Sequence, residues 1–480
     1  MTTATARPRA TKIVATIGPA SWEPEVLRSL LEAGVDVVRI NTAHNTIEAR
    51  RPLVAAIRAA ARDVGRHVAI LQDLAGPKPR TGPLPEGEVI RLNRDDRVAL
   101  IAGDDLMLPT RITIDDPDLV DRLGPGQRVL MADGLIELVV EEADPAGWRA
   151  RVVRGGKLRG RQGVTAPGLP LPPRRISAGE AEDIAFAAEQ DLEYLGVSFV
   201  TSPRDVDLVR EALHSHGGRA GIVAKIERPE ALHVLHDITH VSDAIMVARG
   251  DLGVQLPLEE VPIVQKQIIA LARRHGTPVI TATQMLESMT TQPLPTRAEA
   301  SDVANAVLDG SDAVMLSAET ATGLYPLEAV QVMDRIALAA ERGPSSQRPE
   351  PEEGKRPATV ASTIARAASD IVRRSALVDV IAVFTRSGFS AREVARERPP
   401  VPFVALTNSA FVARQLSLIW GAQVLVAPFA DETERLIATM TDQLRAAGYV
   451  HPADHVLFVG SLTVHQEPGH TDVLHLRQIS

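Results

Sequence analysis

Short apolar runs recur along the first two-thirds of the chain, and amphipathic segments fill most of the gaps between them. An apolar run of a few residues that ends in polar residues is typical of a buried parallel strand. Segments with apolar residues three and four positions apart are typical of the helices that cover such a sheet. Strands that alternate with helices in this number predict a (β/α)8 TIM barrel. The expected strands are Lys12–Ile17, Val35–Ile40, His67–Leu71, Leu192–Val197, Ile222–Ile226, Ala244–Ala248, Pro278–Ala282 and Ala313–Leu316.

The alternation of strands and helices is interrupted in one interval of the barrel. Between Asp73 and Leu192 the pattern changes to short alternating runs with Pro and Gly turns, as in 85–87 and 123–126. Such a pattern predicts an inserted all-β domain of the β-barrel kind, which we place at residues 79–167. The catalytic barrel then comprises residues 11–78 and 168–342. Because the insertion follows a strand at the active-site end, we expect it to act as a lid.

The remaining segments divide clearly by composition. Residues 343–357 are polar and rich in proline, so we predict a linker. Strand and helix patterns resume beyond it, and residues 358–480 are expected to form a separate open-sheet α/β domain. Residues 1–10 are short and polar and lack the apolar core of a signal peptide, so we expect a disordered start.

Composition narrows the function classes. A chain of 480 residues is too long for one compact core, so several domains are expected. A net charge of −9 argues against a general nucleic-acid binder. No apolar run approaches the roughly 18 residues that a membrane span needs. The absence of cysteine excludes disulfides and thiolate chemistry and is compatible with the cytoplasmic location that we predict.

Polar side chains follow nearly every predicted barrel strand. The carboxyl ends of the strands are where a TIM barrel places its chemistry. Any single polar residue there could simply begin a solvated loop, but this interpretation fits poorly when the pattern repeats. The residues concerned are Arg39 and Asn41, Asp73, Ser198, Lys225 and Glu227, Arg249 and Asp251, Thr283, and Ser317 and Glu319.

Two neighbouring predicted strands carry the strongest candidates, because Lys225 and Glu227 end one strand and Arg249 and Asp251 end the next. Parallel strands joined by one crossover place these charges on the same side of the barrel. Mg²⁺ favours one or two protein carboxylates together with substrate oxygens, so we interpret the group as a site for Mg²⁺ (or Mn²⁺) and phosphate. Structural salt bridges with Lys225 and Arg249 are an equally weighted alternative.

Other candidates also have two interpretations. Lys225 and Arg39 can each stabilise a phosphoryl group or simply pair with a carboxylate. His44 lies in a predicted loop, where a lone histidine is usually solvated. A possible effector loop follows a strand of the C-terminal domain, with Thr385, Ser387, Gly388 and Ser390. These residues can form an anion nest, although from the residues alone an ordinary helix N-cap is the better interpretation.

Several of these stretches together resemble pyruvate kinase, over nearly the whole chain. The resemblance implies phosphoryl transfer from phosphoenolpyruvate to ADP, giving pyruvate and ATP, which is the last step of glycolysis. It also implies a barrel, a β lid, a C-terminal allosteric domain and usually a homotetramer. The motifs that carry it are Thr11–Ser21, Ala248–Val254, Ala282–Met289, Pro295–Glu299 and Asp302–Val307.

The resemblance assigns roles by matching motif. Glu227 and Asp251 would hold Mg²⁺, and Lys225 would neutralise the phosphoryl group during transfer. Arg39 would bind the phosphate. The remaining implied substrate contacts are Thr283, Gly250 and the backbone of Asp251 for the substrate carboxylate, together with Ser198. The residues implied to face the nucleotide are His44, Arg80 and Asn41.

Departures from the family pattern concern the monovalent-cation region, which comprises Asn41, Asp73, Leu74 and Lys78. The family often has Phe-Ser after the first of these residues, whereas this chain has Thr42-Ala43, so a hydroxyl that commonly binds K⁺ is absent. Lys78 replaces a glutamate of K⁺-dependent members, and its ammonium can supply the missing charge. We therefore predict an enzyme that does not require K⁺.

Further departures lie in the lid and beside the nucleotide. The lid motif is altered at Gln162, Thr165 and Ala166, and Ala75 replaces a frequent lysine. We expect these substitutions to affect the affinity for ADP more than that for phosphoenolpyruvate. These changes allow a second hypothesis, a non-catalytic paralogue that binds phosphorylated metabolites. A third is a lyase or decarboxylase of the phosphoenolpyruvate/pyruvate barrel type. Retention of the complete metal and phosphate set favours the kinase.

Overall fold

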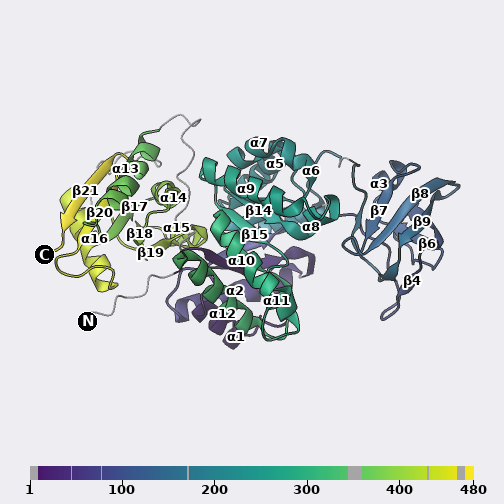
Figure 1. Ribbon diagram of the computed structural model, residues 1–480, viewed down its shortest axis with the longest axis horizontal. Helices are drawn as coiled ribbons and strands as arrows, with labels where there is room; N and C mark the ends of the chain where they lie inside the picture. Colours follow the sequence, from purple (N-terminus) through teal and green to yellow (C-terminus); the bar gives the residue numbers. More distant parts are fainter. Residues whose placement is uncertain are drawn as a thin grey trace.

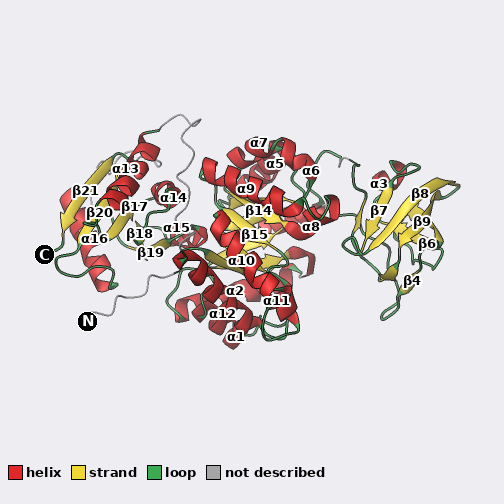
Figure 2. Cartoon of the chain, viewed as in Figure 1, coloured by secondary structure: helices red, strands yellow, loops and turns green. Residues whose placement is uncertain are grey.

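The computed structural model describes residues 9–44, 46–76, 78–169, 172–343, 359–429, 432–461 and 471–480. Three bodies lie in a row, with the barrel in the middle, the C-terminal domain at one end and the inserted β domain at the other (Figure 1). The secondary structure separates in the same way, because the inserted domain is almost entirely strand and loop (Figure 2). The predicted fold class is confirmed.

The central domain is a closed barrel of parallel strands in the order β1-β16-β15-β14-β13-β12-β3-β2. Each predicted apolar run forms a strand, because its residues are buried on both faces. The strands are β1 Lys12–Thr16, β2 Val37–Asn41, β3 Ala69–Asp73, β12 Tyr194–Val197, β13 Gly221–Ile226, β14 Ala244–Ala248, β15 Val279–Ala282 and β16 Ala313–Leu316.

Helices surround the barrel strands, and local capping sets several of their ends. Thr46 caps α2 by accepting the Ala49 N–H, and Thr296 forms a capping box with Glu299 at α10. The crossover between β13 and β14, for which the sequence from Arg228 to Thr239 predicts one helix, instead contains two short helices with a break at Val234. The main helices are α1 Pro24–Glu32, α2 Ile47–Asp63, α4 Ala178–Glu189, α5 Pro203–Ser215, α6 Pro229–His233, α7 Leu235–Val241, α8 Arg249–Gln255, α9 Val261–His275, α10 Arg297–Asp309, α11 Ala318–Ala321 and α12 Pro326–Arg342.

The amino end of the barrel is closed by the C-terminal domain. Leu418, in the short 3₁₀ turn Leu416–Leu418, is buried within the apolar cluster that fills the barrel interior. Beside it, the Tyr194 hydroxyl donates a hydrogen bond to the Gln415 carbonyl (2.8 Å), and Lys12 Nζ donates to the Ala422 carbonyl (2.8 Å). The two domains therefore share one packed interior.

The lid is a six-stranded sheet in the order β11-β7-β8-β9-β5-β6, with a separate β10-β4 pair. Single bridges from Thr81 to Ile114 and from Arg80 to Gly163 connect the two edges of the sheet, which gives the predicted barrel-like form. The alternating runs at 88–92, 97–101, 135–141 and 148–153 of the sequence correspond to β4, β5, β8 and β9, whereas the pattern did not indicate β6, β7, β10 and β11. The strands are β4 Ile90–Leu92, β5 Arg97–Ala102, β6 Arg111–Ile114, β7 Arg128–Met131, β8 Ile136–Asp144, β9 Gly147–Arg154, β10 Gly156–Leu158 and β11 Val164–Thr165, with one helix, α3 Pro117–Asp121.

The C-terminal domain is a five-stranded open sheet in the order β19-β18-β17-β20-β21, in which only β21 is antiparallel. Apolar residues of α13 and α14 cover one face of the sheet and those of α16 cover the other. The elements are β17 Val380–Phe384, β18 Phe403–Thr407, β19 Ala422–Val426, β20 His455–Gly460 and β21 Val473–Gln478, with α13 Val360–Arg374, α14 Phe389–Arg396, α15 Ala410–Gln415 and α16 Thr433–Ala446.

Two predicted irregular segments fall mostly outside the described residues. Of the linker 343–357 only Gly343 is described, and of the start 1–10 only Arg9 and Ala10. These two residues are not disordered as predicted, because Arg9 pairs with Asp36 and the Ala10 N–H donates to Glu341. Within the described part of the chain, no helix has the length and apolar character needed to cross a membrane.

Candidate active site

A cleft of about 320 Å³ lies between the carboxyl ends of the barrel strands and the lid. The barrel contributes residues that end β2, β3, β12 and β13 and the start of α8, and the lid contributes residues of its loops. The cleft therefore gathers most of the predicted site residues. It is lined by Arg39, Asn41, Ala43, Asp73, Leu74, Ala75, Lys78, Arg80, Ala132, Asp133, Arg161, Gln162, Gly163, Ser198, Phe199, Lys225, Glu227 and Asp251.

Lys225 is the centre of the polar network at the floor of this cleft. Its Nζ lies 2.9 Å from Glu227 Oε1, 3.1 Å from Asp73 Oδ1 and 2.7 Å from Ser198 Oγ. Burial alone would lower the pKa of Lys225, but the charges of Asp73 and Glu227 outweigh it and raise the pKa. The ammonium is therefore charged at neutral pH and held in a fixed position facing the cleft.

Arg39 is oriented by the same network. Its Nε donates to Asp73 Oδ2 (2.7 Å) and its Nη1 donates to Thr16 Oγ1 (3.0 Å). Burial would raise the pKa of Asp73, but the adjacent Lys225 and Arg39 lower it below its usual value. One ionised aspartate thus positions two cations at the same wall of the cleft.

Glu227 and Asp251 lie in the same cleft but have different surroundings. Glu227 is 1% exposed, and its Oε2 accepts the Phe199 N–H at 2.7 Å. Burial is the main cause that raises the pKa of Glu227, and the negative charge of Asp251 raises it further, although the Lys225 ammonium acts to lower it. The two carboxylates are thus close enough to repel each other, and a divalent cation between them would relieve that repulsion. The donor set fits Mg²⁺ or Mn²⁺.

Phe199 is a site residue that the sequence pattern did not reveal. It has φ +56°, a left-handed conformation that is unfavourable for a bulky side chain. This conformation directs its N–H at Glu227, and thereby fixes the carboxylate. No periodicity or motif in the sequence carries a signal for such a backbone angle.

Lys78 also lines the cleft, where its contacts join the barrel to the lid. Its Nζ is 2.7 Å from Asp251 Oδ1 and 3.6 Å from Asp133 Oδ1 of the lid. Burial would lower the pKa of Lys78, but these carboxylates raise it, so the ammonium stays charged. Asn41 and Leu74 of the predicted monovalent-cation region line the same cleft.

Thr283 and Gly250 lie beside Asp251 but do not line the cleft. The Gly250 N–H donates to Thr283 Oγ1 (2.8 Å), and this hydroxyl donates to the Ala282 carbonyl (2.7 Å). Arg249, expected to converge on the site, instead binds the carbonyls of Thr283 and Gln284 and pairs with Asp302. That expectation is wrong for Arg249, which braces the loop behind the site.

The residues predicted to face the nucleotide are only partly described. Arg80 lines the cleft, and its Nη1 donates to the Arg161 carbonyl at 3.1 Å. Asn41 also lines the cleft, and its Oδ1 accepts the Ala43 N–H. The side chain of His44 lies outside the described part of the chain.

The predicted effector loop begins α14, but it is not capped by a hydroxyl. Gly388, with φ +81°, is the N-cap residue. Thr385 and Ser390 are buried, and the Ser390 hydroxyl is hydrogen-bonded to that of Thr471 (2.6 Å). The stretch therefore does supply a helix N-cap, with glycine rather than a hydroxyl residue in that position, because glycine accommodates the left-handed turn at the helix start.

Comparisons with known proteins agree over the whole chain. The family model "Pyruvate kinase, barrel domain" matches residues 8–330, and "Pyruvate kinase, alpha/beta domain" matches residues 362–476. A pyruvate kinase of Geobacillus stearothermophilus is 40% identical over 478 residues, which cover 98% of this chain and 81% of the relative. One of Agrobacterium vitis is 40% identical over 459 residues, with 94% of each chain covered. One of Mycobacterium tuberculosis (strain ATCC 25618 / H37Rv) is 39% identical over 478 residues, with 98% of each covered.

Proposed function

Because this chain belongs to the pyruvate kinase family of phosphotransferases, we propose that it transfers the phosphoryl group of phosphoenolpyruvate to ADP in the cleft between barrel and lid. The observation that carries the proposal is the Lys225 ammonium, held charged by Asp73 and Glu227 at the cleft floor. Phosphoryl transfer needs little covalent help from a protein, since positioning and charge neutralisation dominate. A fixed cation beside two carboxylates supplies both.

Individual roles follow from the contacts. Arg39 binds the phosphate, because Asp73 orients it toward the cleft. Lys225 neutralises the phosphoryl oxygens during transfer, and Ser198 keeps its ammonium in place. The family resemblance, and not a contact in the cleft, assigns the substrate carboxylate to Thr283 and the backbone at Gly250 and Asp251.

Glu227 and Asp251 would hold a divalent cation, Mg²⁺ or Mn²⁺. When bound, this ion supplies charge neutralisation for phosphate oxygens. The support is the chemistry of the donor set, two repelling carboxylates beside a phosphate-binding wall. Arg80, His44 and Asn41 face the nucleotide in the same proposal.

The K⁺ independence predicted from the sequence is part of the proposal. Lys78 supports it, because its ammonium lies in the cleft beside Asp251, where a fixed positive charge would replace that of a monovalent ion. Leu74 and Ala43 offer no hydroxyl ligand in the same region.

Three further properties stay proposals that rest on the family resemblance. They are a cytoplasmic location, assembly as a homotetramer, and an anionic effector, such as a phosphorylated metabolite, at Thr385, Ser387, Gly388 and Ser390. Light scattering of the purified protein tests the assembly directly. Titration with sugar phosphates in a kinetic assay tests the effector.

The test of the main proposal is pyruvate release measured with phosphoenolpyruvate, ADP and Mg²⁺. Lys225→Met is expected to lower kcat by at least about 10²- to 10³-fold, since it removes the charge that stabilises the transition state. Lys266→Met is the matched control, because Lys266 pairs with Asp309 away from the cleft. Thermal unfolding checks that both variants fold. Pyruvate formed equally well without ADP, as a lyase or decarboxylase would give, contradicts the proposal, and so does no turnover at all.

A further inference from the structure

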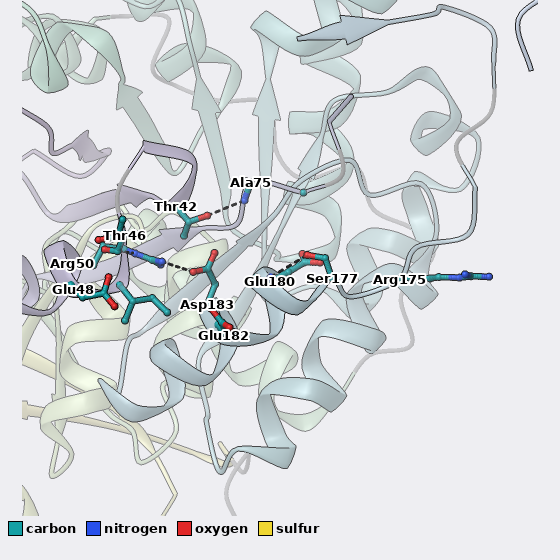
Figure 3. A pocket seen from close by; sticks show the side chains of 13 residues that line it. Thr42, Thr46, Glu48, Arg50, Ala75, Arg175, Ser177, Glu180, Glu182 and Asp183 are labelled. Carbon is teal, nitrogen blue, oxygen red and sulfur yellow. Dashed lines mark hydrogen bonds and ion pairs between the residues drawn. The ribbon is translucent and has the colours of Figure 1, made fainter. Parts of the chain in front are cut away.

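The segment that returns from the lid to the barrel carries a buried arginine, Arg174. The segment runs from the last lid strand, β11, to the start of α4, where Ser177 caps the helix by accepting the Glu180 N–H (Figure 3). The Arg174 side chain is 4% exposed, and its Nη2 pairs with Glu180. A buried guanidinium is costly unless its N–H groups have acceptors. Glu180 supplies one acceptor, and a second comes from the active site.

This second acceptor is the Ser198 carbonyl, to which Arg174 Nη1 donates at 2.7 Å. The Ser198 carbonyl and the Phe199 N–H belong to one peptide group, and this N–H donates to Glu227 Oε2 at 2.7 Å. The C=O and N–H of a planar trans peptide point in opposite directions, so holding one of them fixes the direction of the other. One rigid peptide group therefore connects Arg174 to Glu227.

The backbone at Phe199 needs such a constraint, because its φ of +56° is unfavourable for a side chain of this size. A strained backbone persists only where several contacts hold it. The neighbouring Ser198 Oγ donates to the Leu74 carbonyl (2.7 Å) and accepts from Lys225 Nζ (2.7 Å). These two contacts hold the serine side chain, whereas Arg174 holds the peptide group itself.

The charge of Arg174 adds to this geometric effect. A cation at a carbonyl oxygen polarises the peptide group and strengthens its N–H as a donor, so the Phe199 N–H holds the Glu227 carboxylate more tightly. Glu227 Oε1 lies 2.9 Å from Lys225 Nζ, so each carboxylate oxygen has a fixed partner. Because each of these oxygens can accept a second contact, the fixed carboxylate can still bind a cation.

A second arginine ties the same lid segment to the surroundings of Glu227. Arg228 follows Glu227 in the chain, and its Nη2 donates to the Leu169 carbonyl at 2.8 Å. Its side chain is 5% exposed. Leu169 lies nearer to the lid strand β11, and Arg174 lies nearer to α4. The segment therefore contacts the residues around Glu227 at two separate points.

We propose that Arg174 is a positioning residue for the divalent-cation site, which acts on Glu227 through the peptide group between Ser198 and Phe199. This role rests on the proposed function, in which Glu227 and Asp251 hold Mg²⁺ or Mn²⁺. Residues that orient a metal ligand without touching the metal typically change metal affinity by about tenfold or more. The contact also links the lid segment to the cation site.

The test is Mn²⁺ binding to the full-length protein without substrates, measured by electron paramagnetic resonance. Arg174→Met is expected to weaken Mn²⁺ binding at least about tenfold. Arg175→Met is the matched control and should bind Mn²⁺ as the unmodified protein does, because Arg175 is exposed and points away from Glu180 (Figure 3). Equal affinity of the two variants would overturn this role and leave the proposed function standing. An unmodified protein that neither binds Mn²⁺ nor releases pyruvate would overturn both.

A kinetic measurement distinguishes positioning from a general loss of function. The Mg²⁺ concentration that gives half-maximal activity should rise at least about tenfold in Arg174→Met. At saturating Mg²⁺, kcat should stay within about threefold of that of the unmodified enzyme, since Arg174 touches neither substrate nor the reacting atoms. A fall in kcat with an unchanged requirement for Mg²⁺ would contradict the proposed role.

A second variant and a second measurement separate positioning from folding. Removing Arg174 alone leaves the Glu180 carboxylate, 8% exposed, without its cation. Arg174→Met combined with Glu180→Met removes that cost and should show the same loss of Mn²⁺ affinity, whereas full affinity in the double variant would refute the positioning role. Amide hydrogen exchange of Phe199 should be at least about tenfold faster in Arg174→Met than in Arg175→Met. Equal exchange would show that Arg174 does not hold this peptide group.

Discussion

Replacing Lys78 by methionine tests the proposal that this enzyme does not require K⁺. The ammonium is 2.7 Å from Asp251 and 3.6 Å from Asp133, so its removal leaves two carboxylates in the cleft without their cation. The side chains of Lys78 and Asp251 are 23% and 32% exposed, so solvent screens part of the interaction. A charge-assisted contact of this kind contributes about 1.5–2 kcal/mol, which corresponds to roughly 10- to 30-fold in kcat/KM.

The assay is pyruvate release with Na⁺ or K⁺ as the only monovalent cation. The unmodified enzyme should give equal rates in the two salts. Lys78→Met should lose activity equally in both, because Leu74 and Ala43 give K⁺ no hydroxyl ligands. Lys157→Met, an exposed lysine of the lid, is the control and should keep full activity.

A reconstruction separates lost charge from lost folding. Lys78→Glu combined with Ala43→Ser restores the carboxylate and the hydroxyl of the K⁺-dependent pattern. This double variant should regain activity only when K⁺ is present. Strong K⁺ activation of the unmodified enzyme, or full activity of Lys78→Met, would refute the reasoning.

Three other predictions can be checked independently. Burial lowers the pKa of Lys12 to about 8, below its unfolded value of 10.5, so the buried ammonium destabilises the folded state at low pH. As the pH rises from 8 toward 10.5, the folded state loses this proton before the unfolded state does, and its stability relative to Lys12→Met should increase by up to about 3 kcal/mol. A difference in Tm that does not change with pH would contradict this. Gly76→Ala should lower both Tm and kcat, because the added Cβ would lie 2.8 Å from Ser198 Cβ. The control is Gly65→Ala, which has the same φ of +66° but nothing within 4 Å of the added Cβ, and it should lower Tm only slightly. Equal effects of the two substitutions on kcat would argue against the contact with Ser198. Glu227→Gln should weaken Mn²⁺ binding, measured by electron paramagnetic resonance, at least about tenfold, and unchanged affinity would exclude that residue as a ligand.

Most of the fold could be predicted because burial leaves a direct mark on the sequence. Strands such as Ile222–Ile226 are buried on both faces and therefore apolar throughout, and the charged residues that follow them are conspicuous. Strands of the lid such as Val164–Thr165 were missed, since two residues carry no period. The antiparallel strand Val473–Gln478 was missed because most of its residues are at least partly exposed and its apolar run is weak.

The candidate site was predictable in its residue types but not in its connections. That Lys225 and Glu227 would share a cleft with Asp251 followed from the parallel register of neighbouring strands. The contribution of Phe199 did not, because it depends on a backbone angle rather than a side chain. Arg249 was misplaced for a related reason: a charge at a strand end can turn behind the loop as readily as into the cleft.

Leu418 has a consequence for anyone who wishes to divide this protein. Since a side chain of the C-terminal domain completes the barrel interior, cutting the chain before α13 would open a hole onto the innermost residues of the catalytic half. A shortened version ending at Arg342 should therefore aggregate unless that opening is redesigned with polar substitutions. A foreign regulatory domain joined to the barrel would need an apolar side chain in the position of Leu418 as well as a linker of suitable length.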